Sequence, residues 1–190
     1  MELPGHLGVA MLVYAPVAAL AIERGRHRRA WYGLACVLAL AMSPDVDLYL
    51  PGVAHRTVTH TFLAAAVVGG AVALLVVLLR ARGSGSRPEA VRYGATVGGL
   101  GVLSHLLGDV ITPMGIRPFL PFSDSTYTLS LVYAANQPAN VALLVAGVVV
   151  YATATSKARD SAPTGSGPDA PSFRRAPGRL ASRLRSLVRP

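Results

Sequence analysis

The sequence predicts an all-α fold: a multi-pass membrane helical bundle of about five transmembrane helices, followed by a disordered basic C-terminal tail. Of the 190 residues, 52% are hydrophobic and only 14% are charged, which is too apolar for an ordinary soluble protein of this length. The net charge is +9, and basic residues gather in short segments between long uncharged runs. We therefore expect a membrane domain, residues 1–155, and a flexible tail, residues 156–190, with lipid as the partner and no nucleic acid.

The first two expected spans, residues 7–22 and 30–42, flank an arginine-rich segment. No Lys or Arg precedes residues 7–22, and four Arg follow within residues 23–29. The positive-inside rule therefore favours a first span with its N-terminus outside over a cleaved leader. Residues 30–42 would form about 20 Å of helix, short of a hydrocarbon core of about 30 Å. The second span is thus the least well supported of the five predicted spans.

Three further spans are expected at residues 62–79, 93–108 and 131–155. Residues 62–79 are uncharged over roughly 27 Å of helix and are followed by two arginines. A flexible basic connector, residues 83–88, precedes the fourth span. The first part of the fifth span is interrupted by polar residues, which should face the protein interior.

Two segments outside the spans also carry predictions. Residues 111–130 contain three prolines, which exclude a regular helix and predict a loop lying over the functional site. At the end of the tail, apolar residues recur at helical spacing among arginines: Leu180, Leu184, Leu187 and Val188. This pattern fits a basic amphipathic helix on anionic lipid as well as a disordered basic tail.

Most of the candidate chemistry lies in two short stretches, residues 43–60 and 104–109. The first carries two carboxylates, two imidazoles and a guanidinium: Asp45, Asp47, His55, His60 and Arg56. The second adds His105 and Asp109 at i and i+4, a spacing that places both side chains on one helix face. Asp and neutral His bind zinc, manganese and iron, and the single cysteine, Cys36, excludes a Cys-based zinc motif. The two stretches predict one site for a divalent metal.

The predicted orientation is consistent with a single site. When the basic loops and the tail are cytoplasmic, the N-terminus and both chemistry-bearing loops lie outside. All candidate residues then share one membrane face: His6, Asp45, Asp47, His55, His60, His105 and Asp109. The charge rule takes no account of metal ligands, so this agreement is independent support.

Structural roles for the same residues stay open. His55 and His60 would also suit a polar loop, and His105 with Asp109 would suit a hydrogen-bonded pair at a helix end. Asp45 and Asp47 would also suit helix caps. Two carboxylates at i and i+2 in an extended segment would instead face one cavity.

Three motifs together resemble a known family. PDVD (residues 44–47), HRTVTHT (residues 55–61) and SHLLGDVITPMGIRPFLPFS (residues 104–123) look like the YdjM-like, LexA-binding, inner-membrane family of metal-dependent hydrolases. The resemblance covers about residues 1–150 and implies a multi-pass membrane protein with a metal-dependent hydrolase site. The ligand order is more distantly similar to that of the zinc-dependent phospholipase C and S1/P1 nuclease group. That similarity implies as metal ligands His6, one of Asp45 and Asp47, His60, His105 and Asp109.

The implied reaction is hydrolysis of an ester or phosphoester. A divalent metal, zinc above manganese or iron, would lower the pKa of water and polarise the substrate oxygen. His55, or Asp47 if it is not a ligand, would serve as general base, and Arg56 with Arg117 would hold an anionic phosphate. Because the site would open at the bilayer surface, a lipid or lipid-linked phosphoester is the expected substrate. No further His and Glu follow Asp109 to complete a three-metal cluster, so one or two metals are expected.

Three other functions remain compatible with the residues. An ion transporter would use the same ligands for its cargo, although they gather at one face and no inverted repeat is visible. A soluble all-α phosphodiesterase would suit the short second helix. A non-catalytic metal-binding protein would have a closed site that braces the fold.

Overall fold

The computed structural model describes residues 1–80 and 86–162, and these residues fold into α-helices, one 3-10 helix and connecting loops. The elements are α1 (Leu3–Glu23), α2 (His27–Leu40), η1 (Pro44–Tyr49), α3 (Phe62–Arg80), α4 (Arg87–Val110) and α5 (Gln137–Ser161). Within the described ranges, the β pairing is limited to one isolated antiparallel bridge between Ile116 and Tyr127. The predicted all-α class is therefore confirmed.

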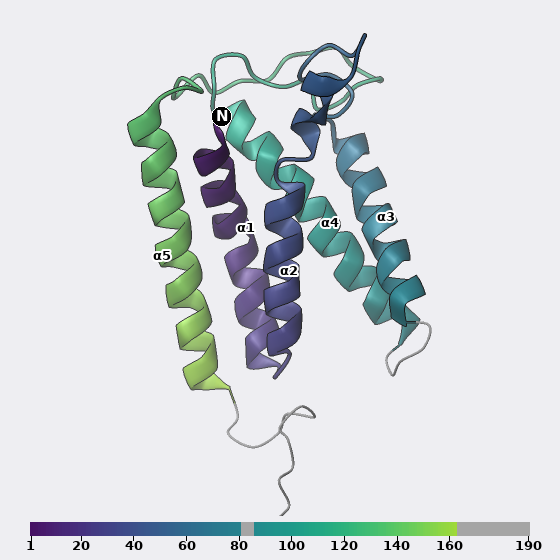
Figure 1. Ribbon diagram of the computed structural model, residues 1–190, viewed down its shortest axis with the longest axis vertical. Helices are drawn as coiled ribbons and strands as arrows, with labels where there is room; N and C mark the ends of the chain where they lie inside the picture. The colour runs from purple at the N-terminus through teal and green to yellow at the C-terminus, as the bar shows by residue number, and fades with distance from the viewer. Residues whose placement is uncertain (81–85, 163–190) are drawn as a thin grey trace, which may run out of the picture.

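Helices α1 and α4 form the centre of the bundle. α1 packs against α5, α2 and α4, and α4 also packs against α2 and α3. Figure 1 shows α5 and α3 on opposite sides of this centre. The loops 41–61 and 111–136 lie together at one end, which we call the loop end, and the turn 24–26 lies at the other, which we call the arginine end. Residues far apart in sequence thus meet at the loop end.

Glycines allow a close contact between α1 and α5. A Cβ atom at Gly8 would collide with the backbone carbonyl of Leu143, and a Cβ at Gly147 would collide with that of Gly8. Small residues allow membrane helices to approach closely enough for dispersion contacts along their backbones. This contact fixes α5 against the helix that carries His6.

Among the described residues, three helices are long and apolar enough to cross a membrane: Leu3–Glu23, Phe62–Leu79 and Gln137–Ser161. α2, with 14 residues, and α4, which carries charged residues near both of its ends, are not among them. Residues 1–80 and 86–162 therefore form five α-helices in the predicted order, of which three are candidate spans.

Several predicted boundaries were wrong. α5 begins at Gln137, not at residue 131, because Asn136 accepts a hydrogen bond from the Ala139 backbone N–H and Pro138 fits the first turn. It continues to Ser161, past the predicted start of the tail, and Arg159 in the last turn is favourable to the helix dipole. α4 begins at Arg87, inside the predicted connector. Ser86 of that connector is described, whereas residues 83–85 are not. The predicted amphipathic tail helix also lies outside the described residues.

The prediction of a non-helical proline-rich loop is confirmed, and Figure 1 shows this segment crossing the loop end of the bundle. Backbone hydrogen bonds tie it to the end of α4: Leu129 donates to Val110 and Leu131 donates to Ile111. The loop is thereby fixed beside the cluster of His and Asp residues.

Candidate metal centre

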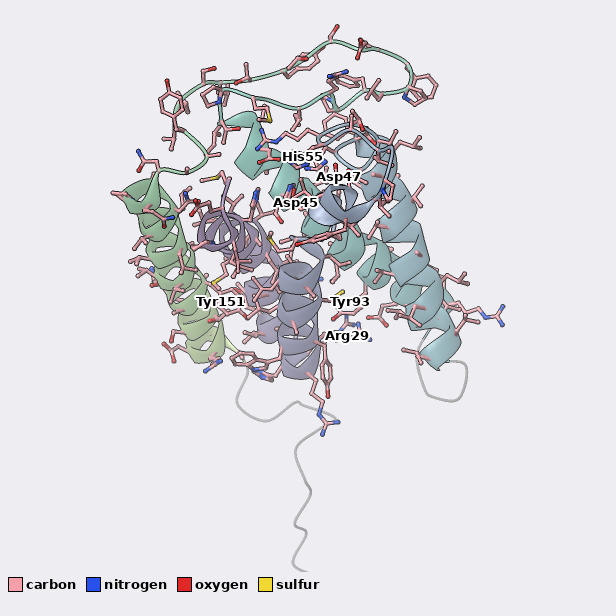
Figure 2. All side chains as sticks on the ribbon, turned by 45° about the horizontal axis from the view of Figure 1, so that its top comes forward. Arg29, Asp45, Asp47, His55, Tyr93 and Tyr151 are labelled. Atoms are coloured by element: carbon pink, nitrogen blue, oxygen red, sulfur yellow. The ribbon has the colours of Figure 1, made fainter. Side chains whose placement is uncertain are left out.

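Four side chains from three parts of the chain converge at the loop end. Asp45 lies on η1, His60 lies in the loop before α3, and His105 and Asp109 lie on α4. One ligand atom from each lies within 4.8 Å of the other three. His60, His105 and Asp109 are buried, whereas the Asp45 side chain is 20% exposed. Figure 2 shows Asp45 and Asp47 below His55 at this end of the bundle.

The spacing of the four ligand atoms matches a tetrahedron. His60 Nε2 lies 3.1 Å from His105 Nε2, and each of these nitrogens lies 3.3 Å from Asp45 Oδ1. Asp109 Oδ2 lies 3.4 Å from His60 Nε2 and 3.3 Å from His105 Nε2. These five distances match edges of a regular tetrahedron whose centre lies about 2.0 Å from each vertex, which is the length of Zn–N and Zn–O bonds. The sixth pair, the oxygens of Asp45 and Asp109, lies within 4.8 Å, so the four residues form a candidate site for a zinc-sized cation.

The polar atoms of the cluster are incompletely satisfied by protein partners. Asp109 Oδ2 is buried, and its nearest nitrogens among the described residues, those of His105 and His60, lie at 3.3 and 3.4 Å, beyond the usual length of an N–H···O hydrogen bond. Burying such an oxygen costs free energy unless a donor or a cation compensates it. A cation at the centre of the tetrahedron would supply that compensation. This is a second reason, beyond the distances, to consider the cluster a metal site.

Electrostatics favour ionised carboxylates at the site. Burial raises the pKa of Asp45, but hydrogen bonds with His105 and His60 outweigh burial and hold this pKa well below its ordinary value. Burial lowers the pKa of His60, but its interactions with Asp109 and Asp45 outweigh burial and raise this pKa above its ordinary value. In the metal-free protein the carboxylates thus favour a proton on His60, and a bound metal would displace that proton.

Asp47, predicted as a ligand or a catalytic group, lies behind His60. Thr59 Oγ1 donates to Asp47 Oδ2 at 2.8 Å and lies 2.9 Å from His60 Nδ1, the ring nitrogen that does not face the cluster. The Oδ2 atom of Asp47 is itself 3.3 Å from that nitrogen. Its Oδ1 is 2.8 Å from His55 Nδ1. Burial raises the pKa of Asp47, but hydrogen bonds from His55 and Thr59 outweigh it and lower this pKa. The Thr59 hydroxyl, with the Asp47 carboxylate behind it, would orient the His60 ring and raise its basicity if His60 bound a metal.

A second group of potential ligands, Asp47, His55 and His60, shares His60 with the first. A neutral imidazole has one lone pair for a metal, because its other nitrogen carries the proton. His60 therefore serves one of the two groups. The tetrahedral group is the more buried of the two and has the more regular spacing, so the geometry favours a single metal ion.

Arg56 is placed differently from its predicted role as an anion clamp. Its side chain is only 8% exposed, and Nη2 lies 2.8 Å from Asp109 Oδ1. Nη1 donates to Thr112 Oγ1 at 2.9 Å and to the Gly115 carbonyl at 3.2 Å, and the backbone N–H donates to Asp47. The guanidinium thus joins Asp109, a candidate metal ligand, to the proline-rich loop. Arg117, the other predicted clamp, pairs with Asp124 on the surface.

His6 reaches the site from α1 but is not one of the four converging ligands. Its ring stacks on that of His105 with centroids 3.8 Å apart, and its Nε2 lies 3.5 Å from Asp109 Oδ1. Both ring nitrogens are buried without a hydrogen-bond partner among the described residues. The stacking requires Gly108, where a Cβ atom would lie 2.7 Å from His6 Nδ1. His6 therefore covers one side of the centre.

His55 is the most accessible imidazole of the cluster, with 31% of its side chain exposed. Its Nδ1 lies 2.8 Å from Asp47 Oδ1, which fixes the orientation of the ring. This arrangement is consistent with the predicted role of His55 as general base.

Sequence reasoning missed the supporting hydrogen bonds. His105 Nδ1 lies 2.7 Å from the carbonyl of Ala41, at the end of α2, and Thr112 joins Arg56 to the end of α4. Thr59 and Thr112 stand in the motifs that carry the resemblance, so their positions offered a signal. The carbonyl of Ala41 has no signature in the sequence.

An open cavity of about 460 Å³ adjoins the cluster on the side of Asp45. Its lining comes from the end of α2 and from η1, and apart from Ser43 and Asp45 it is apolar or aromatic: Ala39, Met42, Val46, Leu48 and Tyr49. Tyr49 is 84% exposed, and Leu48 is also exposed. Partly exposed Asp45 therefore borders an apolar cavity.

The apolar helices and the buried His/Asp cluster define a class of protein: an all-α membrane protein with a candidate metal centre at one end of its bundle. The chain matches the model of the YdjM inner membrane protein family over residues 1–164, and it belongs to this family. The resemblance carried by the three motifs is thus confirmed. Comparisons with curated proteins and with solved structures give no match.

Proposed function

We propose that this protein is a metal-dependent hydrolase that acts on an ester or phosphoester of a membrane lipid. The observation that carries the proposal is the position of Asp45, which belongs to the tetrahedral cluster and also borders the apolar cavity of about 460 Å³. A lipid in this cavity would present its polar linkage to the centre while its apolar part stays among Leu48 and Tyr49.

Each residue of the site has a distinct role in this proposal. Asp45, His60, His105 and Asp109 would hold the divalent cation, and when bound this cation would lower the pKa of water and polarise the ester oxygen. Asp47 orients the rings of His60 and His55. His55 Nε2 takes a proton during the reaction. Arg56 positions Asp109, and its burial argues against direct contact with substrate.

The proposed orientation places the loop end outside the cell membrane and the arginine end in the cytoplasm. It rests on the arginines in residues 23–29, which follow α1, and on the basic residues that follow α3 and α5. The substrate would then be reached from the outer surface of the inner membrane.

A non-catalytic metal-binding or ion-transporting protein is the second candidate, and one observation favours it. Four protein ligands already complete the tetrahedron, whereas catalytic zinc sites keep a position for water or substrate. Asp45 is the partly exposed member of the cluster. Its displacement by substrate, or expansion of the centre to five ligands, would provide that position. Activity therefore distinguishes the two candidates.

The decisive experiment incubates detergent-solubilised, zinc-loaded protein with phospholipids, lipid pyrophosphates and simple esters, with and without chelator. We expect chelator-sensitive turnover of at least one lipid substrate, and we expect His55→Gln to reduce kcat by about 100-fold or more. The exposed Asp124→Asn serves as the matched control and should retain full activity. Zinc binding without any chelator-sensitive turnover would reject the hydrolase and leave the non-catalytic candidate.

A further inference from the structure

A second cavity, of about 580 Å³, opens at the arginine end, away from the candidate metal centre. It lies between the last turns of α1, the start of α2 and the first half of α4. Figure 2 places Arg29 and Tyr93, two of its lining residues, at the opposite end of the bundle from Asp45. Four guanidinium groups and one carboxylate line it: Arg24, Arg26, Arg29, Arg92 and Glu89.

The charges of this cavity are only partly neutralised by the protein. Glu89 forms an ion pair with Arg26 at 2.5 Å and accepts a hydrogen bond from Arg29 at 2.7 Å. Arg24 and Arg92 have no ion-pair partner among the described residues, and both are exposed. One carboxylate against four guanidinium groups leaves a surplus of positive charge inside a concave site. Such a surplus attracts an anion.

Two helix N-termini add to the positive electrostatic potential of the cavity. α2 begins at His27 and α4 begins at Arg87, and residues of the first turn of each helix line the cavity. Neither N-cap residue, Arg26 or Ser86, caps its helix with a side-chain hydrogen bond. The dipoles of the two helices therefore favour negative charge at the cavity.

The remaining wall of the cavity is apolar and belongs to a candidate membrane span. Val17, Leu20 and Ala21 line the cavity from α1, which ends at Glu23. A cavity at the end of a span, with apolar residues toward the span and arginines beyond its end, lies at the depth of lipid headgroups.

We propose that this cavity binds the phosphate of an anionic phospholipid, with one acyl chain along Val17 and Leu20. Arginine forms bidentate, charge-assisted hydrogen bonds with phosphate, and Arg24 and Arg92 are the groups free to form them. Basic pockets between helices at the cytoplasmic surface are typical sites for acidic headgroups. This lipid would anchor the bundle at the end away from the metal centre, so the inference does not depend on the proposed hydrolase.

The test uses purified, detergent-solubilised, zinc-loaded protein titrated with short-chain phosphatidylglycerol, short-chain phosphatidylcholine, glycerol phosphate or inorganic phosphate. We expect phosphatidylglycerol to bind most tightly. The double variant Arg24→Gln, Arg92→Gln should weaken this binding by about tenfold or more, which corresponds to one lost charge-assisted hydrogen bond. Arg28→Gln is the matched control, because Arg28 is exposed on the same turn of basic residues but does not line the cavity.

Unchanged affinity in the double variant, or an equal loss in Arg28→Gln, would overturn the proposal. Equal affinity for phosphatidylglycerol and phosphatidylcholine would do the same, since the choline headgroup neutralises the charge. Equal affinity for glycerol phosphate and phosphatidylglycerol would reject a lipid ligand in favour of a soluble phosphate. Zinc content, measured on each variant, confirms that the distant centre and the fold are intact.

Discussion

His60 and His105 are 45 positions apart in the sequence, yet their Nε2 atoms lie 3.1 Å apart. Two imidazole nitrogens at this distance repel each other unless a proton or a metal ion lies between them. Asp45 and Asp109 place carboxylate oxygens 3.3–3.4 Å from both nitrogens. The fold therefore concentrates four ligand atoms around one point, which is where a cation is expected.

Loss of two ligands should abolish metal binding. We expect the purified protein to carry about one zinc ion per chain, since four ligands suffice for one tetrahedral centre. The double variant His105→Ala, Asp109→Ala should carry almost none by elemental analysis. His27→Ala, at the start of α2 and exposed, is the control. A double variant with an unchanged zinc content would rule out the assigned centre.

Asp47→Asn should weaken zinc binding without abolishing it. The amide would hold Thr59, and through it the His60 ring, less firmly and would lower the basicity of the ring. Comparable changes weaken metal affinity by about 10- to 100-fold. Competition with a chromophoric chelator measures this affinity, with Asp124→Asn as the matched carboxylate control. A loss as complete as that of His105→Ala, Asp109→Ala would instead identify Asp47 as a direct ligand.

The stability of the protein should depend on pH in opposite directions with and without zinc. Burial lowers the pKa of His60, but Asp109 and Asp45 outweigh burial and raise it above the ordinary value of about 6.5. In metal-free protein, the ion pairs of protonated His60 therefore stabilise the fold fully below about pH 6.5. This stabilisation is lost as the pH rises through the raised pKa. Zinc reverses the trend, because protons compete with it for the histidines. The test measures the Tm of chelator-treated and of zinc-loaded protein from about pH 6 to about pH 9. Identical slopes of Tm against pH for the two forms would contradict the prediction.

Gly108→Ala should destabilise the bundle locally at the site. The new Cβ atom would lie 2.7 Å from His6 Nδ1, so either the ring or α1 must move. Such overpacking costs about 1–3 kcal/mol and would lower Tm by roughly 3–10 °C. Gly70→Ala on α3 is the control, because a Cβ there has no neighbour within 4 Å. Equal Tm values for the two variants would show that the His6 ring is not held against α4.

Cysteine labelling tests the proposed orientation. In a Cys36→Ala background, Ser125→Cys in the proline-rich loop should react with an impermeant maleimide in intact cells, and Ser86→Cys before α4 should be protected. Both serines are exposed, so accessibility depends on the membrane side alone. The reverse pattern would place the metal centre in the cytoplasm and the arginine end outside.

The order and type of the helices were predictable because apolar runs and prolines act locally. The uncharged residues 62–79 indicated a span, and Pro113, Pro118 and Pro121 indicated the loop. Helix ends were less predictable, since Asn136 and Pro138 read as interruptions of a span although they begin α5. Capping depends on one hydrogen bond, and hydropathy does not register it.

The sequence by itself determined the helical membrane class, the family motifs and the residues from which the site is drawn. Tertiary structure alone decided their roles: it grouped Asp45, His60, His105 and Asp109, placed Asp47 behind His60, and engaged Arg56 with Asp109. The physical reason is that a ligand's role depends on which lone pair faces which neighbour within a few tenths of an ångström. Residue type and spacing specify the available chemistry, whereas only the packing of α1, α2 and α4 orients it.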